Sequence, residues 1–276
     1  MKNHVPKTHH RFITIPQVTK VAQCITDQTG YISFLGYGGI YDNGMNFHLT
    51  TNKEWAAYYY NKYLFNPSIV KKRLNSGVNY WKKNKAHDIK LIHEDARDNF
   101  DIDAWVEFTY RDNVNQCYYI YSFVANRKNA DKAYLFYDIH RGKLLKFITY
   151  FKQQAAHLIS EAHKPENLVS IPDYSTEGIE NPLRNYAMEL EQENPNTKIS
   201  DREFEIMLIY AAGYTTKNIG EMLHKSEKTI ESHVHSIKQK YGFPDRVAMK
   251  KYLIAKGHDG LEKFFFSYLP EHEHVH

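Results

Sequence analysis

Residues 199–257 read ISDREFEIMLIYAAGYTTKNIGEMLHKSEKTIESHVHSIKQKYGFPDRVAMKKYLIAKG, and this stretch decides the fold of the C-terminal part of the 276-residue chain. Ser200 is followed three residues later by Glu203, the spacing of a capping box that satisfies two backbone amides at a helix start. Apolar residues then recur at helical spacing, at Phe204, Met207, Leu208 and Ala211. Gly213 is expected to end this helix in a left-handed conformation. These features predict the first helix of a small helical domain.

Two more helices are predicted directly after it. Thr215 and Thr216 offer hydroxyl caps for a short helix, and Ser226 caps a longer one after a polar turn at residues 224–226. The inward apolar positions are Ile219, Met222 and Leu223, and then Ile230, Val234, Ile237 and Tyr241. Two helices joined by three or four residues cross steeply, so the second can project into a DNA major groove about 12 Å wide. Its outward positions are all polar: Glu231, Ser232, His235, Lys238 and Gln239.

Several short motifs occur in this stretch in a fixed order. They are Asp201-Arg202-Glu203, GYTTKNI at residues 213–219, Thr229-Ile230, His233, Ile237, Lys240-Tyr241-Gly242 and Arg246. With these motifs at these spacings, residues 199–257 resemble the four-helix DNA-binding domain of LuxR-type transcription regulators. The resemblance implies that residues 230–240 form the recognition helix and that the helix after Asp245 helps to pair two such domains.

The resemblance also assigns contacts to single positions. Base contacts are expected from Glu231, Ser232 and His235, and phosphate contacts from Thr216, Lys217, Lys225, Thr229 and Lys238. Glu231 is a departure, because family members often carry Lys or Arg there, and a carboxylate could instead accept from a cytosine amino group. His233 points partly inward by periodicity, so a packing role and a phosphate contact both stay open for it.

The charge of the chain is concentrated in the same region. Residues 221–256 hold eight Lys or Arg against four Asp or Glu, so they carry a charge of +4, which equals the formal net charge of the whole chain. Such a local excess suits a surface that faces phosphates, and its attraction for DNA should depend on salt.

Other features of the sequence limit the class of protein. Cys24 and Cys117 lie far apart without a zinc pattern, which indicates a reducing cytosol and no metal or other cofactor. The first twelve residues do not resemble a secretory signal, and no stretch has the roughly 18 apolar residues of a membrane span. No Ser/His/Asp or Cys/His set and no Gly-rich phosphate loop stands out, so the chain is not expected to be an enzyme. We therefore expect a bacterial cytoplasmic protein without membrane contact.

The N-terminal part shows both strand and helix patterns. Strands are predicted at residues 31–37 and 45–49, with turns at Gly38-Gly39 and Asn43-Gly44, and at 105–110 and 117–124 as a central hairpin. Helices are predicted at residues 18–26, from residue 51 onward, and at 144–162, where apolar residues repeat at steps of three or four. This last helix should cover the sheet or meet its copy in a second subunit.

Large aromatic residues gather after residue 51. Trp55 and Tyr59 are four residues apart and share a helix face, Asn66-Pro67 forms a turn, and Trp81 follows. Indoles and a phenol near an amide could line a pocket for an amphiphilic small molecule, or they could be ordinary core. Both interpretations stay open on the residues alone.

The run LTTNKEWAAYYYNKYLFNPSIV at residues 49–70, with Trp81, resembles the acyl-homoserine-lactone-binding domain of quorum-sensing LuxR regulators. The resemblance implies an α/β/α sandwich around an antiparallel sheet, with Trp55 and Tyr59 lining a ligand pocket and Trp81 meeting the lactone carbonyl. This chain has Asn66 where the family has an Asp that accepts the ligand's amide proton. It also has Trp105 where the family has glycines beside the pocket. The expected ligand is thus an acyl-homoserine lactone, another small apolar signal, or none.

The predicted organisation is a sensor-like domain at residues 1–170, a linker at 171–197 with a short helix at 183–191, the helix-turn-helix domain at 198–260 and an extension at 261–276. The fold class is α+β for the first domain and a four-helix, all-α bundle for the second. The favoured function is a homodimeric transcription regulator on a two-fold site in double-stranded DNA. The competing hypothesis, motivated by Glu231, is a small-molecule- or protein-binding module whose helical domain no longer binds DNA. The basic runs at 71–73 and 82–85 are expected to be solvated loops or auxiliary DNA contacts.

Overall fold

The computed structural model describes residues 5–74, 76–84, 86–112, 115–175, 187, 190–191, 197–256, 258 and 262. The chain divides into two compact units, Met1–Ile179 and Glu180–His276. Most of the predicted linker lies outside the described residues, and so does nearly all of the predicted extension at 261–276. Of the short helix predicted at 183–191, only residues 187, 190 and 191 are described, and all three are helical.

The first unit is built on a six-stranded antiparallel sheet with the strand order β3-β4-β5-β1-β2-β6. The strands are β1 (Ser33–Tyr41), β2 (Met45–Thr50), β3 (Gly77–Tyr80), β4 (Val106–Asp112), β5 (Cys117–Val124) and β6 (Val169–Ser170). The four strands predicted from residue alternation are confirmed as β1, β2, β4 and β5, and the central hairpin is confirmed as the β4–β5 pair. The two strands that the sequence did not predict, β3 and β6, are short and lie at the sheet edges.

The turn predicted at Gly38-Gly39 is wrong, because both residues lie inside β1. A Cβ on Gly39 would fall 2.2 Å from Cε1 of Phe47 on the neighbouring strand. One on Gly36 would fall 2.7 Å from Nε2 of His48. The glycines therefore sit in this strand because rings from β2 fill the space that their side chains would take.

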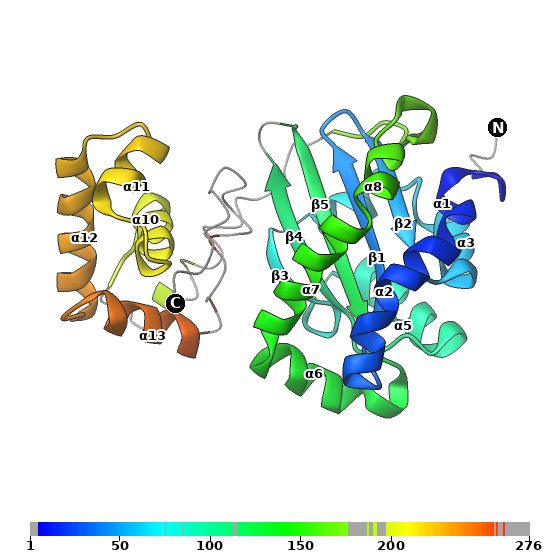
Figure 1. The fold of residues 1–276 in the computed structure, drawn as a ribbon, viewed down its shortest axis with the longest axis horizontal. Helices are drawn as coiled ribbons and strands as arrows, with labels where there is room; N and C mark the ends of the chain where they lie inside the picture. Colours follow the sequence, from blue (N-terminus) through cyan, green and yellow to red (C-terminus); the bar gives the residue numbers. More distant parts are fainter. Residues whose placement is uncertain are drawn as a thin grey trace. The chain divides into compact units, whose positions relative to one another are not determined.

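Helices cover both faces of the sheet (Figure 1). They are α1 (His10–Ile13), α2 (Ile15–Thr29), α3 (Lys53–Lys62), α4 (Pro67–Lys72), α5 (His87–Phe100), α6 (Ala130–Ile139), α7 (Arg141–Gln154) and α8 (Ala156–Ala162). On one face lie α2, α7 and α8, and the Phe34 ring of β1 packs 4.7 Å from that of Phe151 on α7. On the other face lie α3 and α5, with Trp55 and Trp105 in their core. The predicted α/β/α sandwich around an antiparallel sheet is confirmed.

The single long helix predicted at residues 144–162 is wrong, because α7 ends at Gln154 and α8 begins at Ala156, with Ala155 between them. Ala155 leaves the helical conformation (φ −97°, ψ 13°), and its N–H donates to the carbonyl of Phe151 at 2.8 Å. Phe151, Ala155 and Ala162 are all buried on the same side. The apolar spacing therefore continues across the break and hides it from a periodicity argument.

The second unit contains the predicted helical bundle. Its helices are α10 (Asp201–Ala211), α11 (Thr216–Met222), α12 (Glu227–Tyr241) and α13 (Arg246–Ala255). The capping box of Ser200 and Glu203 is present, and the Ser226 hydroxyl accepts from the Thr229 N–H at the start of α12. Gly213 has φ +112°, as expected for the end of α10. The apolar faces of α10, α11 and α12 meet in a common core.

The turn between α11 and α12 depends on a close approach at Gly220. His224 adopts a left-handed conformation (φ 51°), which folds the turn back over α11. The Lys225 N–H donates to the carbonyl of Gly220 at 2.9 Å. A Cβ on Gly220 would fall 2.8 Å from the carbonyl oxygen of Lys225, a backbone atom that cannot rotate away.

We expect the Gly220→Ala substitution to displace this turn. The clash should lower the free energy of unfolding of the C-terminal unit by about 1–3 kcal/mol. Thermal unfolding checks this, with Gly142→Ala as the matched control, because a Cβ on Gly142 of α7 would meet nothing within 4 Å. The control should hold or raise stability by about 0.5–1 kcal/mol, since alanine is the better helix former. Equal effects of the two substitutions would contradict the crowding at Gly220.

Candidate functional site

The outward face of α12 is the first candidate site. The three side chains predicted to contact bases, Glu231, Ser232 and His235, are exposed on it. The opposite side of the helix packs against α10 and α11. The Ser232 hydroxyl donates to the carbonyl oxygen of Lys228 at 3.0 Å, which leaves its lone pairs free to accept. One helix face therefore presents hydrogen-bond donors and acceptors to solvent.

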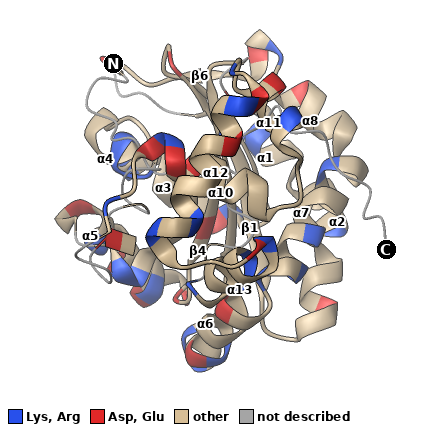
Figure 2. Ribbon diagram, turned by 90° about the vertical axis from the view of Figure 1, so that its left-hand side faces the viewer, with Lys and Arg blue, Asp and Glu red and all other residues tan. Residues whose placement is uncertain are grey.

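Lysines predicted to contact phosphate flank this face. Lys217 on α11 and Lys225 in the turn are exposed, and neither forms an ion pair with a described residue. Lys238 is half-buried, with its ammonium 6.0 Å from the centroid of the Tyr210 ring. Figure 2, which shows Lys and Arg in blue and Asp and Glu in red, has both signs of charge along α12. The surface is thus mixed in charge, with exposed cations beside the polar helix face.

Two predicted phosphate contacts are engaged in local hydrogen bonds. The Thr216 hydroxyl donates to the carboxylate of Glu227 at 3.1 Å, and the Thr229 hydroxyl lies 2.7 Å from that of Ser226. Both bonds lie at the N-termini of α11 and α12. His233, whose role the sequence left open, is half-buried.

A buried carboxylate holds α12 against α10. Glu203 accepts hydrogen bonds from the Lys240 ammonium at 2.6 and 2.8 Å, from the Ser236 hydroxyl at 3.1 Å and from the Ser200 backbone N–H at 3.0 Å. Burial opposes the charge, but the bonds from Lys240 and Ser200 outweigh it and lower the pKa of Glu203. The sequence predicted the capping role of this residue, but not its link to Lys240 thirty-seven residues away.

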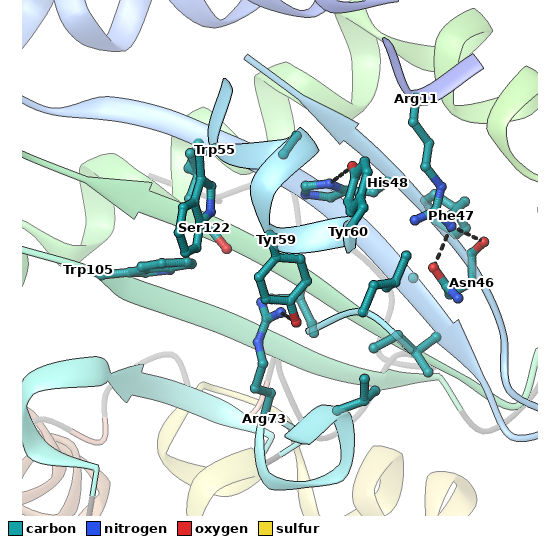
Figure 3. A pocket seen from close by; sticks show the side chains of 18 residues that line it. Arg11, Asn46, Phe47, His48, Trp55, Tyr59, Tyr60, Arg73, Trp105 and Ser122 are labelled. Atoms are coloured by element: carbon teal, nitrogen blue, oxygen red, sulfur yellow. Dashed lines mark hydrogen bonds between the residues drawn. The ribbon is translucent and has the colours of Figure 1, made fainter. Parts of the chain in front are cut away.

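The second candidate site is a cavity in the first unit, between the sheet and α3 (Figure 3). Its volume of about 60 Å³ is room for several waters, since one water needs about 10–15 Å³, or for a small organic molecule. The walls are mostly aromatic and aliphatic. The polar and charged side chains in them are Arg11, Asn46, His48, Tyr59, Tyr60, Arg73 and Ser122.

Of the five residues predicted to bind a ligand, three line the cavity and two do not. Trp55, Tyr59 and Trp105 line the cavity. Trp81 does not line it but stacks on Trp105, with ring centroids 3.9 Å apart and an interplanar angle of 12°. Asn66 does not line it either, because its side-chain oxygen caps α4 by accepting from the N–H groups of Ser68 and Ile69. Three of the five predicted residues are therefore brought together at one cavity.

Sequence reasoning missed six of the seven polar residues of the cavity, and three of these six are basic: Arg11, His48 and Arg73. Burial, followed by the charges of Arg11 and Arg73, lowers the pKa of His48 to about 3, so this imidazole is neutral at neutral pH. The Nδ1 atom of His48 lies 2.5 Å from the Tyr60 hydroxyl. The available signal was the position of His48 in the predicted strand at 45–49. Successive side chains of a strand point to opposite faces, so a polar residue there can lie on the buried face.

Arg73 shows why a basic run need not be solvated. It was expected in a solvated loop or on DNA, yet it donates to the buried carboxylate of Glu107 at 2.5 Å and to the Tyr59 hydroxyl at 2.6 Å. Burial opposes its charge, but Glu107 raises its pKa. The expectation for residues 71–73 is thus wrong at Arg73, because a carboxylate on β4 supplies an interior partner.

Comparisons with known proteins identify relatives of the C-terminal unit by sequence. A family model described as "Bacterial regulatory proteins, luxR family" matches residues 197–252. Over 58 residues the chain is 40% identical to the transcriptional regulatory protein DegU of Brevibacillus brevis. This alignment covers 21% of the chain and 25% of DegU, so the chain spans about a quarter of the length of that relative.

Solved structures give weaker similarities. "SdiA in complex with octanoyl-rac-glycerol" has 16% identity and a TM-score of 0.38, over 89% of this chain and 88% of that one. A structure of Escherichia coli SdiA has 18% identity and a TM-score of 0.38, over 89% and 92%. TM-scores at this level support no argument from a shared fold.

The bundle with its exposed polar α12 defines a helix-turn-helix DNA-binding domain of the kind found in transcription regulators. Residues 197–252 match the LuxR family of bacterial regulatory proteins, which confirms the resemblance of this segment to that family's DNA-binding domain. This is a family of regulators and not of enzymes, as the sequence predicted. None of the helices in the described residues is long and apolar enough to span a membrane.

We expect the Glu203→Gln substitution to weaken the C-terminal unit in a pH-dependent way. The folded-state pKa of Glu203 is lowered, so its charge stabilises the fold above the ordinary glutamate pKa of 4.5, and this contribution disappears as pH falls below that value. Losing the charge-assisted bonds should reduce the free energy of unfolding by about 1–3 kcal/mol at pH 7. Urea denaturation at pH 7 and pH 3.5 measures the gap between wild type and variant. Glu221→Gln, at an exposed position of α11, is the control, and a gap of equal size at both pH values would contradict the assignment.

Proposed function

We propose that the protein is a homodimeric, sequence-specific transcription regulator of the bacterial cytoplasm, with one α12 helix in the major groove of each half of a two-fold DNA site. The observation that carries the proposal is the exposure of Glu231, Ser232 and His235 on one face of α12, while the rest of the helix is held in the bundle. A helix that projects in this way from a steep helix pair fits the major groove.

The two kinds of contact have different expected roles. Glu231, Ser232 and His235 offer acceptors and donors to base edges, which is how sequence is distinguished. Lys217 and Lys225 carry exposed charge beside that face and would neutralise phosphates, which sets affinity and its salt dependence but not sequence preference.

Two alanine substitutions separate these roles. His235→Ala should cost about 1–3 kcal/mol on the preferred site and relax preference at one base pair, with non-specific affinity nearly unchanged. Lys225→Ala should weaken binding to all sequences and flatten the plot of log affinity against log salt by about one unit. Gel-shift titration on sites selected from random DNA, at several salt concentrations, measures both quantities.

The outcomes are distinct. A uniform loss over all sequences for His235→Ala would contradict its role in base recognition, and an unchanged salt slope for Lys225→Ala would contradict its phosphate contact. If the wild-type chain retains no DNA at any salt concentration, the competing hypothesis of a binding module without DNA contact replaces this one.

A second copy of the domain is proposed to pair through α13. Val247 and Ile254 are 59% and 51% exposed, unusual for such side chains, and lie seven residues apart, on one face of the helix. Arg246 anchors the start of α13 by donating to the carbonyls of Gly213 and Tyr214 at 3.0 and 3.1 Å. This helix is thus fixed to the bundle while part of its apolar surface remains exposed.

We expect Ile254→Lys to impair pairing on DNA. Burial of one such side chain contributes about 1.5–3 kcal/mol, so affinity for a site with two half-sites should fall at least about tenfold. Affinity for a single half-site should stay the same. Gel shifts on both DNAs measure this, with Leu91→Lys at an exposed position of α5 as the control. An equal loss on the single half-site would exclude α13 as the pairing surface.

The first unit is proposed to bind a small molecule in its cavity. Apolar walls with a few converging polar groups are typical of ligand sites. A bound ligand would act by favouring one arrangement or pairing of the DNA-binding units, and only through its different affinity for the two states. An acyl-homoserine lactone and other small amphiphilic molecules are the candidate ligands.

A further inference from the structure

Arg11 is a buried cation without a carboxylate partner among the described residues. Its side chain is 1% exposed and lines the cavity. The Nη2 atom donates to the backbone oxygen of Asn46 at 2.5 Å and also to its side-chain oxygen. The guanidinium carbon lies 5.2 Å from the centroid of the Tyr60 ring. The Nε and Nη1 atoms have no hydrogen-bond partner among the described residues. Burial lowers the pKa of Arg11, and the nearby Tyr60 hydroxyl offsets only part of this effect.

The charge of the other arginine of the cavity is paired, whereas that of Arg11 has no carboxylate partner among the described residues. Arg73 is paired with Glu107, and Glu107 also accepts from the Ser122 hydroxyl at 3.0 Å. His48 is neutral at neutral pH. The ionic groups that line the cavity therefore leave one positive charge, on Arg11, that no carboxylate among the described residues neutralises. An unpaired charge in the interior is costly, and the usual solutions are an ion pair or a ligand of opposite charge.

The cavity has a charged side and an apolar side. Figure 3 shows Arg11 and Asn46 on one side of the lining and the indoles of Trp55 and Trp105 on the other. The two indoles pack edge to face, with centroids 5.7 Å apart. This arrangement suits a molecule with an anionic head and an apolar or aromatic body.

We infer that the cavity binds a small amphiphilic carboxylate, whose oxygens accept hydrogen bonds from the free N–H groups of Arg11 and whose apolar body packs against Trp55 and Trp105. The inference deepens the proposed sensing function by naming the chemical class of the ligand. A neutral amide or lactone would leave the charge of Arg11 without compensation. The oxygen of Asn66, the residue aligned with the family's acceptor for an amide proton, is already occupied by two N–H groups of α4.

The first test compares two probes of nearly equal shape on the full-length chain, phenylacetate and the neutral phenylacetamide. All three tryptophans of the chain are at or directly behind the cavity, so intrinsic fluorescence reports binding, and calorimetry confirms it. We expect phenylacetate to bind at least about tenfold more tightly, because only its carboxylate neutralises the buried charge of Arg11, whereas the amide leaves that charge uncompensated. Equal affinities, tighter binding of the amide, or no binding of phenylacetate would overturn the inference.

The second test removes the charge with Arg11→Met, which keeps an unbranched apolar stem but is shorter by the end of the guanidinium group. Affinity for phenylacetate should fall at least about tenfold and affinity for phenylacetamide should not. Arg97→Met, at a half-exposed arginine of α5 that does not line the cavity, is the control and should leave both affinities unchanged. Unchanged phenylacetate binding in a folded Arg11→Met protein would overturn the inference. If this variant does not fold, the comparison of the two probes on the wild-type chain still decides.

Both tests are made without DNA. Failure of phenylacetate to bind in a chain that still retains its DNA site would exclude the carboxylate ligand and leave the DNA-binding function in place. Loss of DNA binding in a chain that binds phenylacetate would do the reverse.

Discussion

The carboxylate of Glu203 is the group on which the geometry of the DNA-binding unit depends. It closes the start of α10 through Ser200 and also holds the last turn of α12 through Lys240 and Ser236. A buried charge is tolerated only where its hydrogen-bonding capacity is filled, and here every element that meets at this point supplies a donor. The orientation of the proposed recognition helix relative to α10 is therefore set by a specific polar contact in addition to apolar packing. Apolar packing alone would restrict the angle between the two helices less.

In the first unit, the extent to which a buried charge is hydrogen-bonded distinguishes a structural residue from a candidate ligand-binding residue. The carboxylate of Glu107 is buried but satisfied by Arg73 and Ser122, so it connects β4 and β5 to the segment after α4. Arg11 is buried just as deeply, but only one of its three nitrogens donates to another described residue. A satisfied buried charge stabilises one packing of the elements, whereas an unsatisfied one beside a cavity points to a ligand.

Local and tertiary signals differ in what they could predict. Caps and turns depend on neighbours within four residues, so Ser200, Ser226 and Gly213 located the helices of the C-terminal unit correctly. Gly38 and Gly39 led to a wrong prediction of a turn, because side-chain rings from another strand, and not a local turn, account for glycine at these positions. Ala155 was missed because the apolar repeat runs unbroken through it. For α6, two apolar residues, Leu135 and Ile139, are exposed, so no clean amphipathic stripe marked this helix.

From the sequence alone, the helix-turn-helix class, the antiparallel sheet with helices and the aromatic cluster on the helix after residue 51 were determined, because caps, periodicity and alternation are properties of short segments. Which aromatic residues line the cavity, and which merely support it, was decided by tertiary structure. Trp81 lies behind Trp105, and Asn66 is used as a helix cap. The partners of Glu203, Glu107 and Arg11 were likewise decided there, since whether a buried charge is neutralised depends on side chains brought together from distant parts of the chain.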